Sequence, residues 1–233
     1  DGVKITRLPL YLSHDSSALK RVANYVSFAA SILFYGLFGA QRADVIYAYH
    51  PPLTVGMAAR LIRLFRRIPV VYDIQDMWPD TLRATGMLNS EKALGVVSRV
   101  CDWVYRGVDR IVVLSPGFRR LLIERGVPDS KIEVIYNWCD ETQLAEVACG
   151  LPSAFPVPEY FRILFAGTMG KAQALDAVML AAEIILTRRP EVRFVFVGGG
   201  VEVERMQGLV LERQLANVVF VPRVPMSEVG AML

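Results

Sequence analysis

Short apolar runs alternate with longer amphipathic segments along most of the chain, a pattern typical of parallel strands connected by helices. The runs rich in valine, isoleucine and aromatic residues predict strands at 3–7, 45–49, 70–72, 110–114, 132–135, 162–166, 193–197 and 218–221. The amphipathic segments predict helices at 18–38, 53–66, 91–106, 116–125, 172–188 and 201–211. The dipeptide Ser115-Pro116 marks one helix start, because serine caps a helix and proline suits its first position.

The predicted strands are apolar almost continuously, which indicates parallel sheets covered on both faces. We therefore expect an α/β protein with two Rossmann-like, doubly wound domains. The pattern changes at residues 141–160, where strands disappear and prolines gather, as in a linker. The expected organisation is a first domain at 1–140, a linker at 141–160 and a second domain at 161–233. Two such domains would face a ligand-binding cleft.

Two successive strand-to-helix junctions of the second domain end in glycine. Glycine allows a ligand to approach the backbone closely, and the first amides of the following helix carry partial positive charge. Both junctions predict a site for a phosphate-bearing ligand, although the same glycines also suit ordinary tight turns. Neither junction has the Gly-x-Gly-x-x-Gly spacing of a dinucleotide-dependent dehydrogenase. The first junction carries Gly167, Thr168, Gly170 and the cationic Lys171, and the second carries Gly198, Gly199 and Gly200.

Composition narrows the class of protein. The 233 residues are 53% hydrophobic and 21% charged, with a net charge of +3, which supplies ample material for buried cores. The basic residues are scattered, so we expect no nucleic-acid binding. The three cysteines, Cys101, Cys139 and Cys149, lack metal-ligand spacing. They argue for a reducing, cytoplasmic compartment, and we expect neither a disulfide framework nor a bound metal.

Residues 22–40 are almost wholly apolar and are flanked by Lys20, Arg21 and Arg42. The segment is slightly short for a membrane-spanning helix, which needs roughly 20 residues. A helix packed on both sides within the core is the expectation, and shallow insertion into a membrane surface is the alternative. Polar residues recur at helical spacing on one of its faces, at Asn24, Ser27 and Ser31.

Several motifs resemble those of the family 4 glycosyltransferases. Residues 111–140 contain a Val-Leu-Ser strand end, a helix, Gly-Val-Pro, a strand and then Tyr-Asn-Trp-Cys-Asp, in the order found at the end of that family's N-terminal domain. The segments Asp-Ile-Gln-Asp-Met-Trp-Pro-Asp at 73–80 and Gly-Thr-Met-Gly-Lys-Ala-Gln-Ala-Leu at 167–175 resemble the WbuB-like subgroup, which acts in O-antigen and capsule assembly and is associated with L-fucosamine. The resemblance extends over essentially the whole chain. It implies the two-domain GT-B fold.

The resemblance also implies an activity. Such enzymes transfer a sugar from a nucleotide-sugar donor with retention of configuration and without a bound metal. The resemblance favours a UDP-linked amino sugar as the donor of this chain. The implied acceptor is a lipid-linked saccharide or polysaccharide precursor, which would place the protein at the inner face of the plasma membrane, with residues 22–40 as a peripheral contact. Lys171 resembles the family's diphosphate-binding lysine, whereas Thr168 stands where the family has an arginine. Gly198, Gly199 and Gly200 resemble its glycine-rich turn beside the nucleotide.

Candidate acceptor-side residues lie in the first domain. Gln75 and Asp76 stand where many family members have a His-Asp pair, and glutamine donates a hydrogen bond but does not titrate. Asp76 and the nearby Asp73 are candidates for orienting an acceptor hydroxyl, or for capping the turn that follows. His50 ends a predicted strand, where it would contact acceptor or donor, or else stabilise a loop.

The family's first strand with its glycine-rich loop, and its later pair of glutamates, are not found in these 233 residues. We therefore expect the chain to be part of a longer enzyme, and to have little transferase activity alone. Two alternatives are a sugar-nucleotide 2-epimerase on the same fold and a non-catalytic nucleotide-binding or membrane-associated fragment. The Asp-Met-Trp-Pro and Gly-Lys-Ala-Gln segments favour the transferase over the epimerase.

Overall fold

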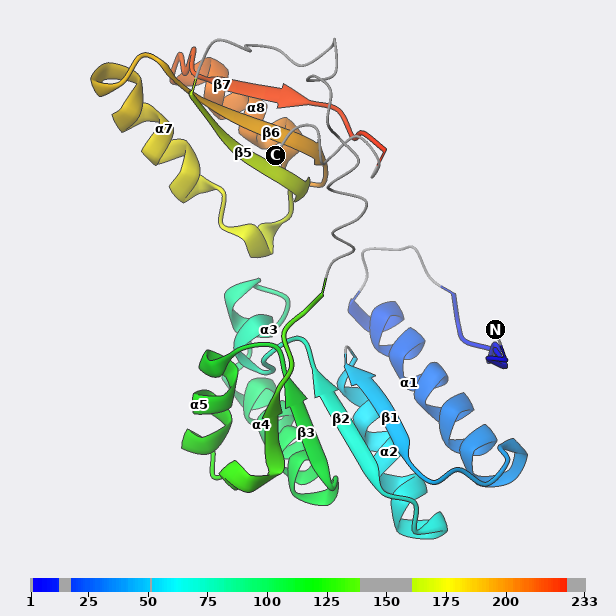
Figure 1. Ribbon diagram of the computed structural model, residues 1–233. Coiled ribbons are helices and arrows are strands. Elements are labelled where there is room, and N and C mark those ends of the chain that lie inside the picture. Colours follow the sequence, from blue (N-terminus) through cyan, green and yellow to red (C-terminus); the bar gives the residue numbers. More distant parts are fainter. Residues whose placement is uncertain (1, 13–17, 51, 139–160, 226–233) are drawn as a thin grey trace. The chain divides into compact units, whose positions relative to one another are not determined.

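The computed structural model describes residues 2–12, 18–50, 52–138 and 161–225. The chain divides into two compact units, Asp1–Asn137 and Trp138–Leu233, shown in Figure 1. The predicted linker at 141–160 lies outside the described residues. Each unit is an α/β structure with its own parallel sheet and its own core.

The sheet of the first unit has four parallel strands in the order β1-β2-β3-β4. All four lie where the sequence predicts strands. Their register pairs His50 with Ile74, and Ile74 with Val113, so the carboxyl ends of three strands lie side by side. The strands are β1 (Ile46–His50), β2 (Val70–Ile74), β3 (Arg110–Val113) and β4 (Ile132–Val134).

The strand predicted at 3–7 does not form, because residues 2–12 are neither helix nor strand. Backbone groups of this segment pair instead with polar side chains of α1 (Ala18–Phe34). Asn24 donates to the Tyr11 carbonyl over 2.7 Å, the Tyr11 amide donates to Ser27 Oγ over 2.8 Å, and Ser31 donates to the Pro9 carbonyl over 2.6 Å. The polar face of this helix therefore holds an extended segment in place of a neighbouring strand.

The helices of the first unit begin and end close to the predicted positions. Ser115 Oγ accepts a hydrogen bond from the Phe118 amide and Pro116 occupies the first turn, as the sequence indicated. A short helix at 80–84 was not expected. The elements are α1, which continues into the π-helical turn η1 (Tyr35–Gly39), α2 (Leu53–Arg66), α3 (Asp80–Ala84), α4 (Glu91–Gly107), α5 (Pro116–Glu124) and the 3₁₀ turn η2 (Asp129–Lys131).

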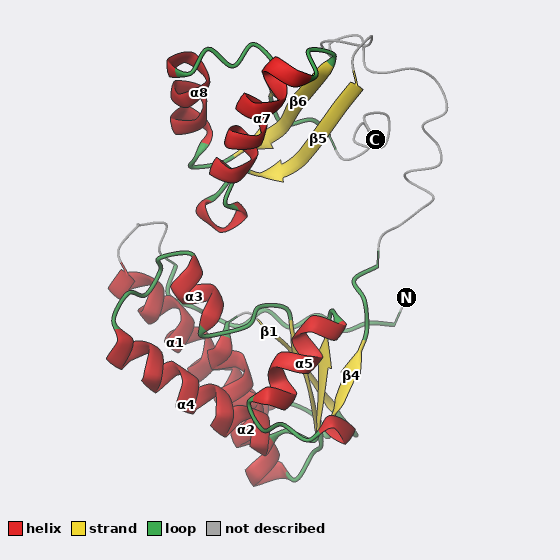
Figure 2. Ribbon diagram, turned by 90° about the vertical axis from the view of Figure 1, so that its left-hand side faces the viewer, coloured by secondary structure: helices red, strands yellow, loops and turns green. Residues whose placement is uncertain are grey.

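The core of this unit lies on one face of the sheet. Alternate strand residues such as Tyr72 and Ile111 pack against α2, α4 and α5, and Figure 2 shows α1, α2 and α4 on one side of the strands. Gly56 of α2 is required there, since a Cβ atom would lie 2.6 Å from the Tyr72 ring. The sequence predicted helices on both faces of the sheet, but in the described part of the chain the helices that contribute to this core all lie on one face. Tyr47 and Tyr49 of the edge strand β1 stay more than half exposed on the opposite face.

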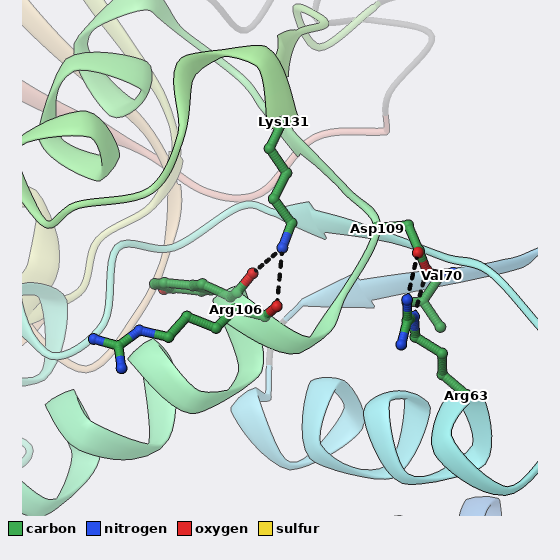
Figure 3. Close-up of polar contacts among 6 residues, drawn as sticks. Arg63, Val70, Arg106, Asp109 and Lys131 are labelled. Carbon is green, nitrogen blue, oxygen red and sulfur yellow. Dashed lines mark hydrogen bonds and ion pairs between the residues drawn. The ribbon is translucent and has the colours of Figure 1, made fainter. Parts of the chain in front are cut away.

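An ion pair and hydrogen bonds attach the helices to the amino ends of the strands (Figure 3). Arg63 of α2 donates two hydrogen bonds of 2.6 Å to Asp109, which also accepts from the Val70 amide over 2.8 Å. The guanidinium, through these hydrogen bonds, holds the pKa of Asp109 below its usual value. Lys131 donates to the carbonyls of Tyr105 and Arg106, which end α4. These contacts fix α2 and α4 against the sheet.

The second unit has three parallel strands in the order β5-β6-β7. Its core lies between the helices and the face of β6 that carries Phe194 and Phe196. Strands β5 and β6 run further than predicted, through their terminal glycines. The helix predicted from residue 172 begins at Asp176, because Ala174 takes a left-handed conformation after a 3₁₀ turn. The elements are β5 (Phe161–Thr168), η3 (Lys171–Gln173), α7 (Asp176–Arg188), β6 (Val192–Gly199), α8 (Val203–Glu212) and β7 (Val218–Val221).

Candidate functional site

The two glycine junctions of the second unit are joined directly at the carboxyl edge of its sheet. Gly167 pairs with Gly198 in the ladder between β5 and β6. The Met169 amide donates to the Gly199 carbonyl over 2.9 Å, and the Met169 carbonyl accepts from the Glu202 amide over 3.1 Å. The first loop is therefore hydrogen-bonded to the start of the second loop and to the turn that precedes α8.

Two of these glycines are required by the packing between the loops. A Cβ atom on Gly198 would lie 2.1 Å from the Gly167 carbonyl oxygen, and one on Gly200 would lie 2.1 Å from that of Met169. Both also have positive φ angles, 135° and 154°. Gly199 differs, since a Cβ atom there would meet no atom within 4 Å. Space for a ligand beside the backbone is thus present at Gly199.

Lys171 follows the first junction and lies on an open pocket of about 440 Å³. Residues from both junction regions line this pocket, including Gly170, Asp176, Glu202 and Arg205. The Gly170 amide, which the sequence placed among the ligand-binding groups, already donates to Gln173 Oε1 over 3.0 Å. Thr168 ends β5 beside it with its side chain exposed. The pocket therefore combines a lysine, an arginine and two carboxylates.

Arg205 is a functional candidate that the sequence did not indicate. Its guanidinium donates to both carboxylate oxygens of Asp176, over 2.7 and 3.1 Å, and to Glu202 over 2.6 Å. These hydrogen bonds raise the pKa of Arg205 and lower the pKa of Asp176. The i, i+3 spacing of Glu202 and Arg205 is a local signal, but Asp176 lies 29 residues away. Arg205 links the first turns of α7 and α8 beneath the two junctions.

In the first unit, Gln75 and Asp76 leave the sheet directly after β2, beside the end of β1. Asp73 points to the face opposite the helices, where it is buried and accepts hydrogen bonds of 2.6 Å from Tyr47 and 2.7 Å from Gln75. Partial loss of water around its hydroxyl, together with the hydrogen bond to Asp73, raises the pKa of Tyr47 to about 12. Asp76 is half-buried in the bend, and its carbonyl accepts from the Trp78 amide. Gln75 thus stabilises Asp73 in this structure.

His50 lies in the core, with 2% of its surface exposed. Its ring packs edge-on against Tyr72 and Trp78, at centroid distances of 5.8 and 5.4 Å. Burial lowers its pKa to about 4, so the imidazole is neutral at pH 7. The position at the end of β1 agrees with the prediction, but strand alternation directs the side chain toward the helices. The sequence left two roles open for His50, contact with a substrate or stabilisation of a loop, and its packing against Trp78 fits the second.

The apolar segment at 22–40 lies in α1 and η1. Among the residues that the structure describes, one helical stretch, Val22–Gly39, is long and apolar enough to cross a membrane. No residue of this stretch is fully buried, so the expected burial on both sides is wrong. One face packs on α2, and a second binds residues 9–11. The third face is exposed and entirely apolar. This apolar stripe consists of Val22, Val26, Ala30, Phe34 and Phe38.

Comparison with known proteins gave matches over both units. Residues 1–138 match the family model described as glycosyl transferase 4-like domain, and residues 154–233 match that of glycosyl transferases group 1. The probable glycosyltransferase WbjE of Pseudomonas aeruginosa is 25% identical over 193 residues, covering 81% of this chain and 48% of that protein. The putative colanic acid biosynthesis glycosyl transferase WcaI of Escherichia coli K12 is 28% identical over 240 residues, with 98% and 58% covered. The chain thus spans about half the length of these relatives.

Solved structures show the same fold. Anabaena HepE, in complex with UDP-glucose, matches with a TM-score of 0.57 at 15% identity, over 91% of this chain and 55% of that one. Sucrose-phosphate synthase from Thermosynechococcus elongatus matches with a TM-score of 0.65 at 16% identity, over 95% and 54%. The predicted GT-B fold is confirmed.

Proposed function

Because the chain belongs to the family of glycosyl transferase 4-like domains, we propose that it is the core of a transferase that moves a sugar from a nucleotide-sugar donor to a saccharide acceptor. The reaction would serve the synthesis of a bacterial surface polysaccharide, in line with the name of WcaI, a putative colanic acid biosynthesis glycosyl transferase. One observation carries the donor part of this proposal. The two hydrogen-bonded glycine junctions leave space beside the backbone at Gly199, and Lys171, which follows the first junction, lines the pocket that residues of both junction regions form.

Departure of a nucleoside diphosphate from the sugar is the step that this site would assist. Negative charge develops on the leaving phosphates, and preorganised cations and amides lower the barrier by stabilising it. We assign Lys171 to the diphosphate. Arg205 is held by two carboxylates, so its charge is largely matched within the protein and its role is to position the loops. The retaining, metal-free course implied by the resemblance suits a site that relies on such cations and amides.

A UDP-linked amino sugar is our proposed donor. The similarity of residues 167–175 to the WbuB-like subgroup supports the amino sugar, and the complex of HepE with UDP-glucose agrees with a uridine nucleotide. Transfer to the acceptor would take place at the carboxyl edge of the first unit's sheet. Asp76 is the residue there that we propose orients the acceptor hydroxyl, while Gln75 and His50 act through the contacts that fix Asp73 and Trp78.

We propose that the acceptor is linked to a lipid and that α1 meets the membrane. The apolar stripe runs over more than four helical turns, and more than half the surface of Val22, Val26, Phe34 and Phe38 is exposed. A stripe of this kind beside basic residues is typical of helices that lie in the surface of an anionic membrane. Lys20 and Arg42 flank the segment in the sequence.

Calorimetric titration of the 233-residue chain with UDP, GDP and NAD tests the donor site. We expect a nucleoside diphosphate to bind and NAD not to bind. Lys171→Ala should weaken the binding at least about tenfold, the loss that removal of one charge-assisted contact produces. Lys92→Ala, an exposed lysine of the first unit, is the matched control and should leave the affinity unchanged. Equal affinity in the wild type and Lys171→Ala would contradict the proposal.

A further inference from the structure

An apolar pocket of about 310 Å³ lies in the first unit between α1, α2, α3 and α4. Its walls include Val22 and Val26 of α1, Met57 of α2, and Val97 and Val100 of α4. Its size is at the lower end of the range for small-molecule sites. None of the residues named in the preceding subsections as donor-binding contributes to it.

The pocket offers little to water or to a polar ligand. Two of its lining side chains, Thr54 and Tyr25, carry a hydroxyl group. The Thr54 hydroxyl already donates a hydrogen bond to the Tyr25 carbonyl over 3.2 Å. A water molecule is retained in a cavity when two to four polar partners hold it. A hydrocarbon is therefore the ligand that matches these walls.

One end of the pocket reaches the proposed acceptor site. Trp78 lines the pocket and packs edge-on against His50, the last residue of β1. Asp76 lies two residues before Trp78, and its carbonyl accepts from the Trp78 amide over 3.1 Å. A chain lying in the pocket would thus bring its head group toward the carboxyl edge of the sheet.

The pocket also continues onto the apolar stripe. Val22 and Val26 line it and are 56% and 54% exposed, and the stripe extends from them to Phe34 and Phe38. A hydrocarbon chain can therefore pass from a membrane surface into the pocket over apolar side chains. The composition of the pocket indicates an apolar ligand, and its continuity with the exposed stripe indicates that this ligand is a lipid.

We propose that this pocket binds the part of the acceptor's hydrocarbon chain next to its phosphate head. The identity of the lipid as the acceptor rests on the proposed function, whereas the binding of a hydrocarbon chain does not. The stripe then holds the protein at the membrane, and the pocket selects an acceptor with a long alkyl or isoprenoid chain.

Titration of the 233-residue chain with dimethylallyl, geranyl and farnesyl phosphate tests the proposal. Affinity should rise with chain length, by roughly fourfold for each methylene that leaves water, until the pocket is filled. Val97→Phe and Val100→Phe fill the pocket with apolar volume and should each weaken farnesyl phosphate binding at least about tenfold. Phe65→Ala, an exposed phenylalanine of α2 that belongs to neither the stripe nor the pocket, is the matched control and should not change it.

Thermal melts check that each filling variant is folded, and having two variants guards against the failure of one. Equal affinity for the three phosphates, or binding unaffected in a folded filling variant, would overturn the proposal. Concentration-dependent dimerisation that Val97→Phe abolishes would overturn it as well, because a second copy would then occupy the pocket. UDP binding without farnesyl phosphate binding would contradict this inference alone. The reverse result would contradict the proposed donor site and leave the hydrocarbon site standing.

Discussion

Arg205 of α8 holds Asp176 of α7 through two hydrogen bonds of 2.7 and 3.1 Å, although the two residues are 29 positions apart. The same guanidinium holds Glu202, whose amide is bonded to the Met169 carbonyl of the first glycine loop. One arginine therefore adds a side-chain link between the regions of both junctions, in addition to the backbone hydrogen bonds that join them.

Arg205→Ala should weaken UDP binding, because its two ion pairs fix the loops. The pair with the exposed Asp176 contributes little to folding, whereas Glu202 is buried and would lose its partner, so we also expect a moderate fall in the melting temperature. Calorimetry and thermal melts measure the two effects. Arg213→Ala removes a similar pair, the 2.9 Å contact with Glu183 near the other end of α8, and serves as the control. Equal losses of affinity in the two variants would show that Arg205 has no special role in positioning the site.

The glycines of the second junction should separate into two classes. Gly198→Ala forces a Cβ atom against the Gly167 carbonyl at a positive φ angle, and we expect it to cost about 1–3 kcal/mol of unfolding free energy. Gly199→Ala should change stability by no more than about 0.5 kcal/mol and should still reduce UDP affinity. Urea denaturation and calorimetry on both variants check this. Unchanged UDP affinity in Gly199→Ala would argue against a ligand beside that residue.

Asp109→Asn should destabilise the protein by about 1–2 kcal/mol at pH 7, since it disrupts the paired contact with Arg63 and weakens the one with the Val70 amide. The pKa of Asp109 is lowered in the folded state. Its contribution is therefore present above the carboxyl's unfolded pKa, about 3.9, and is lost as the pH falls through the folded value. The difference between variant and wild type in urea denaturation should shrink at acidic pH. Asp129→Asn, which disrupts an exposed pair with Arg119, should have a much smaller effect.

His50→Phe should flatten the acid limb of the stability curve. The folded pKa of about 4 lies below the unfolded value near 6.5, so the unfolded state binds the proton first as the pH falls. This single group should cost the wild type about 3 kcal/mol between pH 7 and pH 4. Urea denaturation at pH 7, 5.5 and 4 measures the slope. An unchanged slope in the variant would mean that the imidazole is accessible to protons in the folded protein.

Replacing Phe34 and Phe38 together by serine should lower the fraction of protein that floats with anionic vesicles. The centroids of the two rings lie 5.2 Å apart, and the two residues form the most exposed part of the apolar stripe. Phe65→Ser, an equally exposed phenylalanine at the end of α2, is the control. Flotation of the double variant at the wild-type level would contradict membrane contact through α1.

The sequence predicted those features that depend on neighbouring residues. Seven of the eight expected strands formed, since each is a continuous apolar run, and the glycine junctions lie where the strands end. The strand expected at 3–7 did not form, and the chain that follows it is held by non-local contacts, since Asn24, Ser27 and Ser31 bind the backbone of residues 9–11. The Arg205 network is likewise non-local. His50 was placed correctly along β1, but its burial depends on Tyr72 and Trp78, which come from other parts of the chain.

The most direct test of the central claim is a residue-resolved NMR titration of the ¹⁵N-labelled chain with UDP. The account predicts saturable shifts of the Lys171 and Gly199 amides, while amides of the first unit such as Val112 stay unchanged. In Lys171→Ala the shift of the Gly199 amide should need at least about tenfold more UDP to saturate. Saturable shifts confined to other residues, or none at these two amides, would contradict a nucleotide site at the glycine junctions.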